Sequence, residues 1–258
     1  AGAAAVAAAA RAAALEESEL IRTVDLGREE TNGRRAWILD PIDGTKGFLR
    51  GQQYCTALAL VDDCEEGRRD AVVGVLGCPN LSRDGRLDDG APQGDGVVAA
   101  AARGAGCFRR PLAGGEWEAM RTNALRESHA GGRLVEGVAA AHSDHGASAR
   151  AAAALGLVEE PLRLDSQAKA ALLAGGSADL FCRLPRRGYV EKVWDFAAAK
   201  VVISEAGGAI TDLRGRDIDV GRGDELDPAV DGIVASGSPA LHAAALDAVN
   251  AGRAAEEG

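Results

Sequence analysis

The chain has 258 residues, enough to bury a sizeable core, and 47% of them are apolar but only 3% aromatic. Its formal net charge of -10 argues against a protein that binds nucleic acid through the phosphate backbone, because such proteins carry a basic face. No stretch holds the roughly 18 consecutive bulky apolar residues of a membrane span, so we expect no membrane insertion.

The first half of the chain predicts a helix followed by antiparallel strands. Residues 1–30 are rich in alanine and then place leucine, isoleucine and valine near helical spacing. "RRAWILD" predicts a short strand that ends at Pro41, and "YCTALALVDD" with "AVVGVLGCP" predicts an antiparallel hairpin. "VVAAAARGAGCFRR" predicts a further strand with a tight turn, and residues 82–96 before it hold the turn formers and charges of a surface loop.

From about residue 130 the pattern changes to alternating strands and helices. "RLVEGVAA", "LRLD", "DLFCRLP", "AITDL" and "GIVASG" predict strands, while "SARAAAALG", "SQAKAALLAGGSA", "WDFAAAKVVISEAGG" and "SPALHAAALDAVNAG" predict helices. We therefore expect a layered sandwich of helices and sheets, with an α+β subdomain over residues 1–128 and an α/β subdomain over residues 129–258.

One segment, "WILDPIDGTKGFLRG" at residues 37–51, concentrates oxygen ligands at the predicted end of a strand. Asp40 and Asp43 are three residues apart, and two carboxylates that close repel each other unless a positive charge lies between them. If Pro41 ends the strand, the Ile42 carbonyl is left without a ladder partner and can point to the same place. Carboxylates and a carbonyl suit Mg²⁺, and the hydroxyl of Thr45 could orient an attacking water.

Further candidates lie in the second half of the chain. Asp195 stands at the predicted start of a helix, where its simpler role would be an N-cap kept ionised by the helix dipole. Ser166 and Lys169 share a helical face, and Arg183 suits bidentate contact with a phosphate. Taken alone, Ser166 would be a helix cap and Lys169 a solvated lysine. His142 alone would be an ordinary surface histidine.

The five cysteines favour neither a zinc site nor a disulfide framework. They form no C-x-x-C pair and their number is odd. We expect free thiols in a reducing compartment, with a regulatory pair as the alternative.

Two blocks in order, D-P-I-D-G-T at residues 40–45 and W-D-x-A-A…E-A-G-G at residues 194–208, resemble the lithium-sensitive, magnesium-dependent phosphatases. That superfamily includes inositol monophosphatase, fructose-1,6-bisphosphatase and the 3'(2'),5'-bisphosphate nucleotidases. "DGTKGFLRG", "LDSQAK" and "CRLP" are most similar to the nucleotidases, and the resemblance covers nearly the whole chain. It implies the layered fold of the sugar phosphatases, with the metal site in the first subdomain and the substrate site in the second.

The resemblance implies a metal centre with two or three Mg²⁺ ions. Asp40, Asp43 and Asp195 would be ligands together with the Ile42 carbonyl. Asp43 and Thr45 would act in catalysis, Thr45 by helping to activate the attacking water.

The resemblance also implies a set of substrate contacts. Ser166, Lys169, Arg183 and His142 would hold the nucleotide, and Asp195 would border the substrate as well as the metal.

The pattern of the family leads us to expect a chain truncated at its amino terminus. The family supplies an acidic pair from an earlier strand, whose first glutamate bridges two metal ions. Glu16 and Glu17 stand at a suitable distance from Asp40 for the shorter monophosphatases, but the sequence after them resembles a helix that the nucleotidases insert after their own acidic pair. We therefore expect the bridging glutamate before residue 1. Ala199 replaces the glycine of the second block.

The activity implied by the resemblance is hydrolysis of the 3'-phosphate of adenosine 3',5'-bisphosphate to AMP and phosphate. The alternatives are an inositol polyphosphate 1-phosphatase and an inactive fragment that binds nucleotide without turnover. We expect a monomer whose partner is a small anionic substrate, with neither nucleic acid nor membrane involved. The cytosol, the mitochondrion and the plastid all stay open as its compartment.

Overall fold

The computed structural model describes Glu16, Ser18, Glu19 and Arg22 and residues 35–64, 69–85, 94–123, 131–138, 144–185 and 188–257. The chain forms two compact units, Ala1–Ala36 and Trp37–Gly258. In the first unit Ser18, Glu19 and Arg22 are helical and Glu16 is not, and the rest of the helix expected over residues 1–30 lies outside the described residues. The second unit carries the sheets and the candidate site.

The first sheet has six strands in the order β1-β2-β3-β4-β5-β6. From β2 to β6 each strand pairs antiparallel with its neighbour. The predicted hairpin is confirmed as β2 and β3, and the predicted strand with a tight turn is the hairpin of β4 and β5. The strands are β1 (Ala36–Asp43), β2 (Cys55–Asp63), β3 (Arg69–Cys78), β4 (Val97–Ala102), β5 (Gly106–Pro111) and β6 (Glu118–Met120).

The predicted end of β1 is wrong. The strand continues through Pro41 and ends at Asp43, where Gly44 turns the chain into the short helix α3 (Thr45–Leu49). β1 is an edge strand, and an edge tolerates proline because one side of the strand needs no ladder hydrogen bonds. The hydroxyl of Thr56 on β2 donates to the Pro41 carbonyl over 2.9 Å, which helps to hold the proline in place.

The second sheet has five strands in the order β10-β11-β9-β7-β8 and is mixed. β7 runs parallel to β8 and β9, whereas β9, β11 and β10 pair antiparallel. The strands are β7 (Arg133–Glu136), β8 (Glu159–Arg163), β9 (Leu180–Arg183), β10 (Ala209–Asp212) and β11 (Ile233–Ser236). The predicted boundary between residues 128 and 129 stays a prediction.

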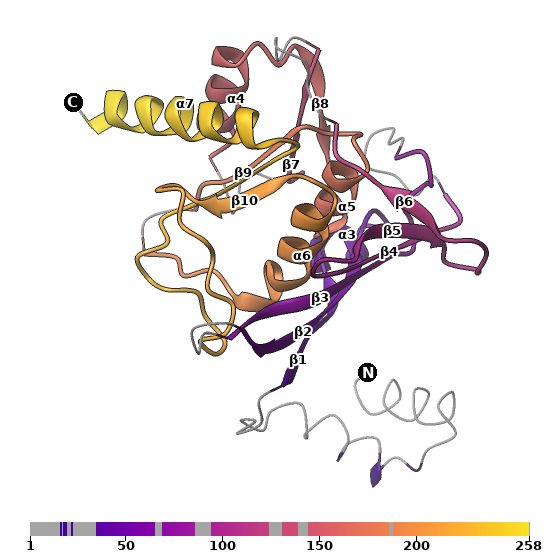
Figure 1. Ribbon diagram of the computed structural model, residues 1–258. Helices are drawn as coiled ribbons and strands as arrows, with labels where there is room; N and C mark the ends of the chain where they lie inside the picture. Colours follow the sequence, from indigo (N-terminus) through magenta and orange to yellow (C-terminus); the bar gives the residue numbers. More distant parts are fainter. Residues whose placement is uncertain are drawn as a thin grey trace. The chain divides into compact units, whose positions relative to one another are not determined.

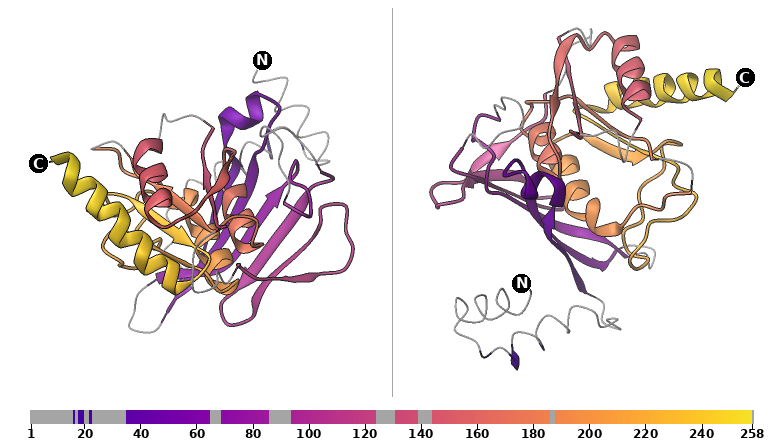
Figure 2. Two further views of the ribbon diagram at one scale, coloured as in Figure 1. Left: turned by 90° about the horizontal axis from the view of Figure 1, so that it is seen from above. Right: turned by 180° about the vertical axis from the view of Figure 1, so that it is seen from behind.

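Helices fill the space between the two sheets and cover the far face of the second. α5 (Ala168–Ala174) and α6 (Ala197–Glu205) lie between the sheets, and α4 (His145–Ala154) and α7 (Pro239–Glu257) pack together beyond the second sheet (Figures 1 and 2). This alternation of sheet and helix layers confirms the predicted layered sandwich. None of the described helices has the length and apolarity needed to cross a membrane.

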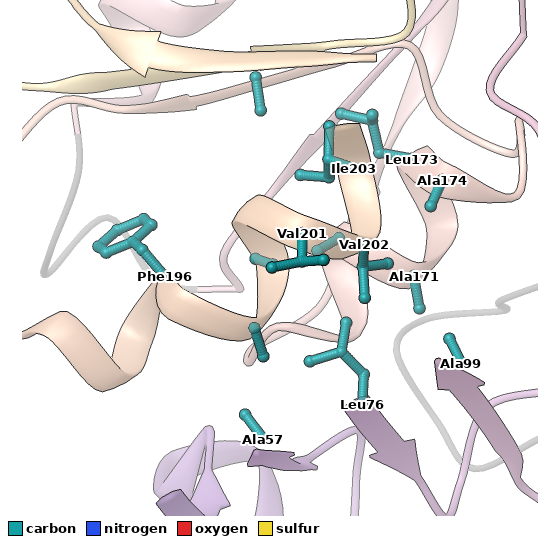
Figure 3. Close-up of a cluster of buried hydrophobic side chains, with 14 of the residues drawn as sticks. Ala57, Leu76, Ala99, Ala171, Leu173, Ala174, Phe196, Val201, Val202 and Ile203 are labelled. Carbon is teal, nitrogen blue, oxygen red and sulfur yellow. The ribbon is translucent and has the colours of Figure 1, made fainter. Parts of the chain in front are cut away.

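The core between the sheets is built around α6. Figure 3 shows Val201 and Val202 of α6 above Leu76 of β3, with α5 alongside. A Cβ at Gly74 of β3 would lie 2.5 Å from the Ala198 carbonyl oxygen, so the glycine lets the strand and the helix approach closely. The ammonium of Lys200, also buried on α6, donates to Asp70 of β3 over 2.7 Å. α6 is therefore fixed against the first sheet.

The cysteines are free thiols, as the sequence predicted. Four of them are buried, and the sulfur atoms of Cys55 and Cys78, on neighbouring strands, are 3.7 Å apart. Burial raises the pKa of Cys107 and of Cys182 to about 12, so both stay protonated at neutral pH.

Candidate active site

Three aspartates from distant parts of the sequence meet at one point. Asp40 and Asp43 come from β1, and Asp195 ends the 3₁₀ turn η2 (Val193–Asp195) just before α6. One carboxylate oxygen of each lies within 4.8 Å of the other two. In the part of the chain that the structure describes, this is the one such group of three acidic, histidine or cysteine side chains. The structure thus brings together the three aspartates that the sequence singled out.

The electrostatics of the cluster favour a cation. Burial and then repulsion by Asp43 raise the pKa of Asp195 to about 7, although Arg183 opposes the shift. Burial is also the main cause that raises the pKa of Asp43 and of Asp40, against Lys169 and hydrogen bonds in the case of Asp43. Because all three carboxyl groups resist ionisation, the positive charge near the cluster is too small to compensate them. A divalent cation with oxygen ligands would supply the missing charge.

The N-cap role considered for Asp195 is wrong. α6 begins at Ala197 with Phe196 at the cap position, and no side chain caps it. Asp195 lies one residue further back, in the 3₁₀ turn, where the carboxylate faces Asp43 and Asp40. Its pKa is raised, whereas a helix N-terminus would lower it.

The turn after β1 brings further oxygen atoms to the cluster. The Ile42 amide donates to the Asp40 carboxylate over 3.1 Å, and the Thr45 hydroxyl donates to the Ile42 carbonyl over 3.3 Å. Ile42, Gly44 and Thr45 line the same cavity as the aspartates. The structure thus places Ile42 and Thr45 beside the aspartates, and it adds a hydrogen bond between them that the sequence did not indicate.

A second turn, at residues 165–167, packs against the first. Ser166 has φ 77°, an unusual left-handed conformation for a residue with a side chain, and is buried. A Cβ on Gly44, itself at φ +81°, would lie 2.6 Å from the Ser166 Cβ. The amide of Gln167 donates to the Asp43 carboxylate. The two turns are in direct backbone contact, and that contact helps to hold Asp43.

Replacing Gly44 by alanine tests this contact. We expect Gly44→Ala to push the two turns apart, lowering the free energy of unfolding by about 1–3 kcal/mol and weakening cation binding. Gly51→Ala is the matched control, because Gly51 also has a positive φ of +68° but a Cβ there meets nothing within 4 Å. Thermal unfolding and titration with Mn²⁺ check both variants. Equal cation affinity in the two would contradict the role given to the Gly44–Ser166 contact.

Two positively charged side chains, those of Lys169 and Arg183, lie beside the aspartates. Lys169 donates from its ammonium to the Ser166 carbonyl over 2.7 Å and lies 5.6 Å from the centre of the Phe181 ring. Burial lowers the pKa of Lys169, opposed by Asp43. Arg183 forms a bidentate ion pair with the buried Glu191, with N···O distances of 2.6 and 3.1 Å. The partner of Arg183 was not foreseen, because the sequence analysis treated the arginine only as a phosphate ligand.

The three aspartates, Lys169 and Arg183 border one cavity of about 410 Å³, a size suited to a small ligand. Its polar lining includes Asp40, Asp43, Asp195, Ser166, Gln167, Lys46, Lys169 and Arg183, and its apolar lining includes Leu173, Phe181, Ile203 and Ile210. Tyr189 borders the cavity as well. The cavity thus joins an acidic cluster to basic and aromatic side chains.

Some candidates lie outside this description. His142 and Glu17 are not among the described residues, and Glu16 belongs to the other compact unit. Gln167 and Glu191 were not among the predicted site residues, although Gln167 stands within "LDSQAK" and Glu191 three residues before Trp194. Nothing local marks them, since their partners lie elsewhere in the chain.

A family model described as the inositol monophosphatase family matches residues 4–253. The chain belongs to this family. The family is generally magnesium-dependent, and the acidic cluster fits that property.

Two curated relatives are named 3'(2'),5'-bisphosphate nucleotidase. A 3'(2'),5'-bisphosphate nucleotidase of Emericella nidulans is 39% identical over 232 residues, which are 85% of this chain and 64% of the relative. One from Oryza sativa is 40% identical over 238 residues, 89% of this chain and 64% of the relative. The chain therefore spans about two thirds of the length of these relatives, slightly less in each case.

Solved structures share the fold. An inositol monophosphatase from Zymomonas mobilis has a TM-score of 0.63 and 21% identity, covering 95% of this chain and 84% of that one. CysQ from Bacteroides thetaiotaomicron has a TM-score of 0.57 and 20% identity, covering 80% of this chain and 71% of that one. At these identities the likeness concerns the fold alone.

Proposed function

We propose that this chain is a magnesium-dependent phosphatase that removes the 3'-phosphate of adenosine 3',5'-bisphosphate, giving AMP and phosphate. The observation that carries the proposal is the similarity to bisphosphate nucleotidases from a fungus and a plant, at 39% and 40% identity over most of the chain. The acidic cluster beside a cavity with basic walls supports it, because a phosphate ester and its cation need both signs of charge.

The proposed ligands of Mg²⁺ are Asp40, Asp43, Asp195 and the Ile42 carbonyl, holding two or three ions. The donors are oxygen atoms only, the set that Mg²⁺ prefers, and the raised pKa of Asp195 marks a site short of positive charge. When bound, the cations would supply charge neutralisation at the phosphate and a more acidic water as nucleophile.

Thr45 and Asp43 are the proposed catalytic residues. The Thr45 hydroxyl donates a hydrogen bond to the Ile42 carbonyl over 3.3 Å, so its oxygen lone pairs can accept a hydrogen bond from the attacking water. Asp43, fixed by the Gln167 amide, would orient that water from the other side. No covalent intermediate on the protein is required.

The proposed nucleotide site uses the basic and aromatic walls of the cavity. Lys169 and Arg183 would neutralise the phosphates, with Arg183 held in a fixed orientation by Glu191. Ser166 and Asp195 border the same space, and Phe181 offers a flat apolar surface to a base. His142 stays a proposed nucleotide contact.

Phosphate release in the presence of millimolar Mg²⁺ tests the proposal. Adenosine 3',5'-bisphosphate and inositol 1,4-bisphosphate are supplied in parallel, with and without lithium, to the full chain and to Asp43→Asn. We expect turnover of the nucleotide that requires Mg²⁺, stops with lithium and is absent from the variant. Turnover of the inositol phosphate alone would assign a polyphosphate 1-phosphatase instead, and nucleotide binding without turnover would assign a non-catalytic binding protein.

A further inference from the structure

One residue, Gln167, forms hydrogen bonds with both motif blocks of the site. Its backbone amide donates to the Asp43 carboxylate of the first block. Its side-chain amide donates to the Trp194 carbonyl over 2.9 Å and accepts from the Ala199 amide over 3.1 Å, both in the second block. Trp194 precedes Asp195 directly and Ala199 follows it by four residues, so the side chain of Gln167 spans the segment that presents Asp195.

The position of Gln167 is itself determined by its surroundings. The side chain is 6% exposed, and the preceding Ser166 is held at φ 77° against Gly44. The Ser166 hydroxyl oxygen also accepts from the Ala168 amide over 3.2 Å. A buried amide whose donor and acceptor are both engaged has one orientation, because any other leaves polar atoms unpaired.

The carboxylates need such a constraint. With no cation between them, Asp43 and Asp195 repel each other, and Asp195 lies in a single 3₁₀ turn with little stiffness of its own. The bonds of Gln167 tie the two carboxylate-bearing segments to one residue. Groups that orient metal ligands in this way usually matter for metal affinity almost as much as the ligands do.

We propose that Gln167 is a positioning residue, whose side-chain amide fixes the segment carrying Asp195 relative to Asp43 and thereby sets the affinity of the site for a divalent cation. The inference rests on the metal site of the proposed function. It concerns a residue whose side-chain amide is hydrogen-bonded to the backbone of the second block, and whose backbone and side-chain hydrogen bonds both lower the pKa of Asp43.

Binding of Mn²⁺ to the full chain without substrate tests the proposal, measured from the electron paramagnetic resonance signal of the free ion. Gln167→Met keeps nearly the same volume and loses both side-chain hydrogen bonds, and Gln167→Asn keeps the amide on a side chain too short to reach both partners. Gln53→Met is the matched control. Gln53 is a second buried glutamine, which donates to the Asn80 carbonyl over 2.8 Å and does not border the cavity.

We expect Gln167→Met to raise the dissociation constant for Mn²⁺ by about 10- to 100-fold, and Gln167→Asn to raise it in the same direction by less. We expect Gln53→Met to lower the melting temperature by about as much as Gln167→Met does, without changing Mn²⁺ affinity. Wild-type affinity in both Gln167 variants would overturn the proposal, as would an equal loss of affinity in Gln53→Met. Absence of Mn²⁺ binding by the wild-type chain is a different result, which would overturn the proposed metal site and this inference with it.

Discussion

Replacing Asp195 by asparagine is expected to abolish the proposed phosphatase activity while stabilising the protein without metal at pH 8. Loss of a charged ligand should lower kcat/KM by at least about 10³-fold, equivalent to ~4 kcal/mol of transition-state stabilisation. The same change removes a carboxylate that Asp43, Glu191 and Asp40 repel and that burial disfavours. We therefore expect the free energy of unfolding to rise by about 2 kcal/mol.

The opposite signs of these two effects separate a functional from a structural aspartate. Asp212 is the control, because it is also buried but accepts hydrogen bonds from two backbone amides and the side chain of Arg216. Asp212→Asn should destabilise the protein by roughly 1–3 kcal/mol and leave kcat/KM near the wild-type value. Kinetics with Mg²⁺ and thermal unfolding in EDTA measure both variants. A destabilised Asp195→Asn would contradict the assignment of Asp195 to a site that lacks its counter-charge.

The hairpins and helices that the sequence predicted are those that depend on the pattern of neighbouring residues. Alternating apolar residues mark β2 and β3, and the alanine-rich segment before Leu155 marks α4. The three-residue β6 lacked such a signal, since a strand so short shows no periodicity. The extension of β1 through Pro41 depends on its place at the sheet edge, which the order of strands decides and the local sequence does not reveal.

The features of the site also divide into those that the local sequence indicates and those that it does not. Asp40, Asp43 and Asp195 could be found because each lies in a short block with its own pattern. The contacts of Gln167 could not, because the residues that it joins are 124 and 32 positions away. The ion pair between Lys200 and Asp70 spans 130 positions, and a lysine within an apolar helical segment reads as solvent-exposed unless its partner is known. Long-range pairing of buried polar groups is thus the information that a single sequence lacks.

The stability of the chain should fall with rising pH in the absence of Mg²⁺, and Mg²⁺ should offset that fall. In the folded protein the pKa of Asp195 is about 7, raised from the ordinary value of 3.8 that the unfolded chain retains. The folded state therefore binds more protons than the unfolded state between these values. The stabilising contribution of the protonated carboxyl is complete below about pH 4 and is lost as the pH rises through 7, by at most about 4 kcal/mol. The raised pKa values of Asp40 and Asp43 act in the same direction.

Mg²⁺ should oppose this trend, because its ligands must be deprotonated. At a Mg²⁺ concentration 100 times the dissociation constant, binding adds about 2.7 kcal/mol, which for a chain of this length raises the melting temperature by roughly 5–10 °C. We expect that rise to be small near pH 5 and full near pH 8. The measurement is thermal unfolding across this range with Mg²⁺ or EDTA, in the wild type and in Asp195→Asn.

The variant is needed in this experiment because other groups titrate in the same range. Burial lowers the pKa of His242, so that group makes the protein more stable as the pH rises and partly hides the effect of the aspartates. The difference between wild type and Asp195→Asn cancels the histidine, which both proteins share. If the Mg²⁺-induced rise in melting temperature were the same at pH 5 and pH 8, the cation would bind elsewhere than at these carboxylates.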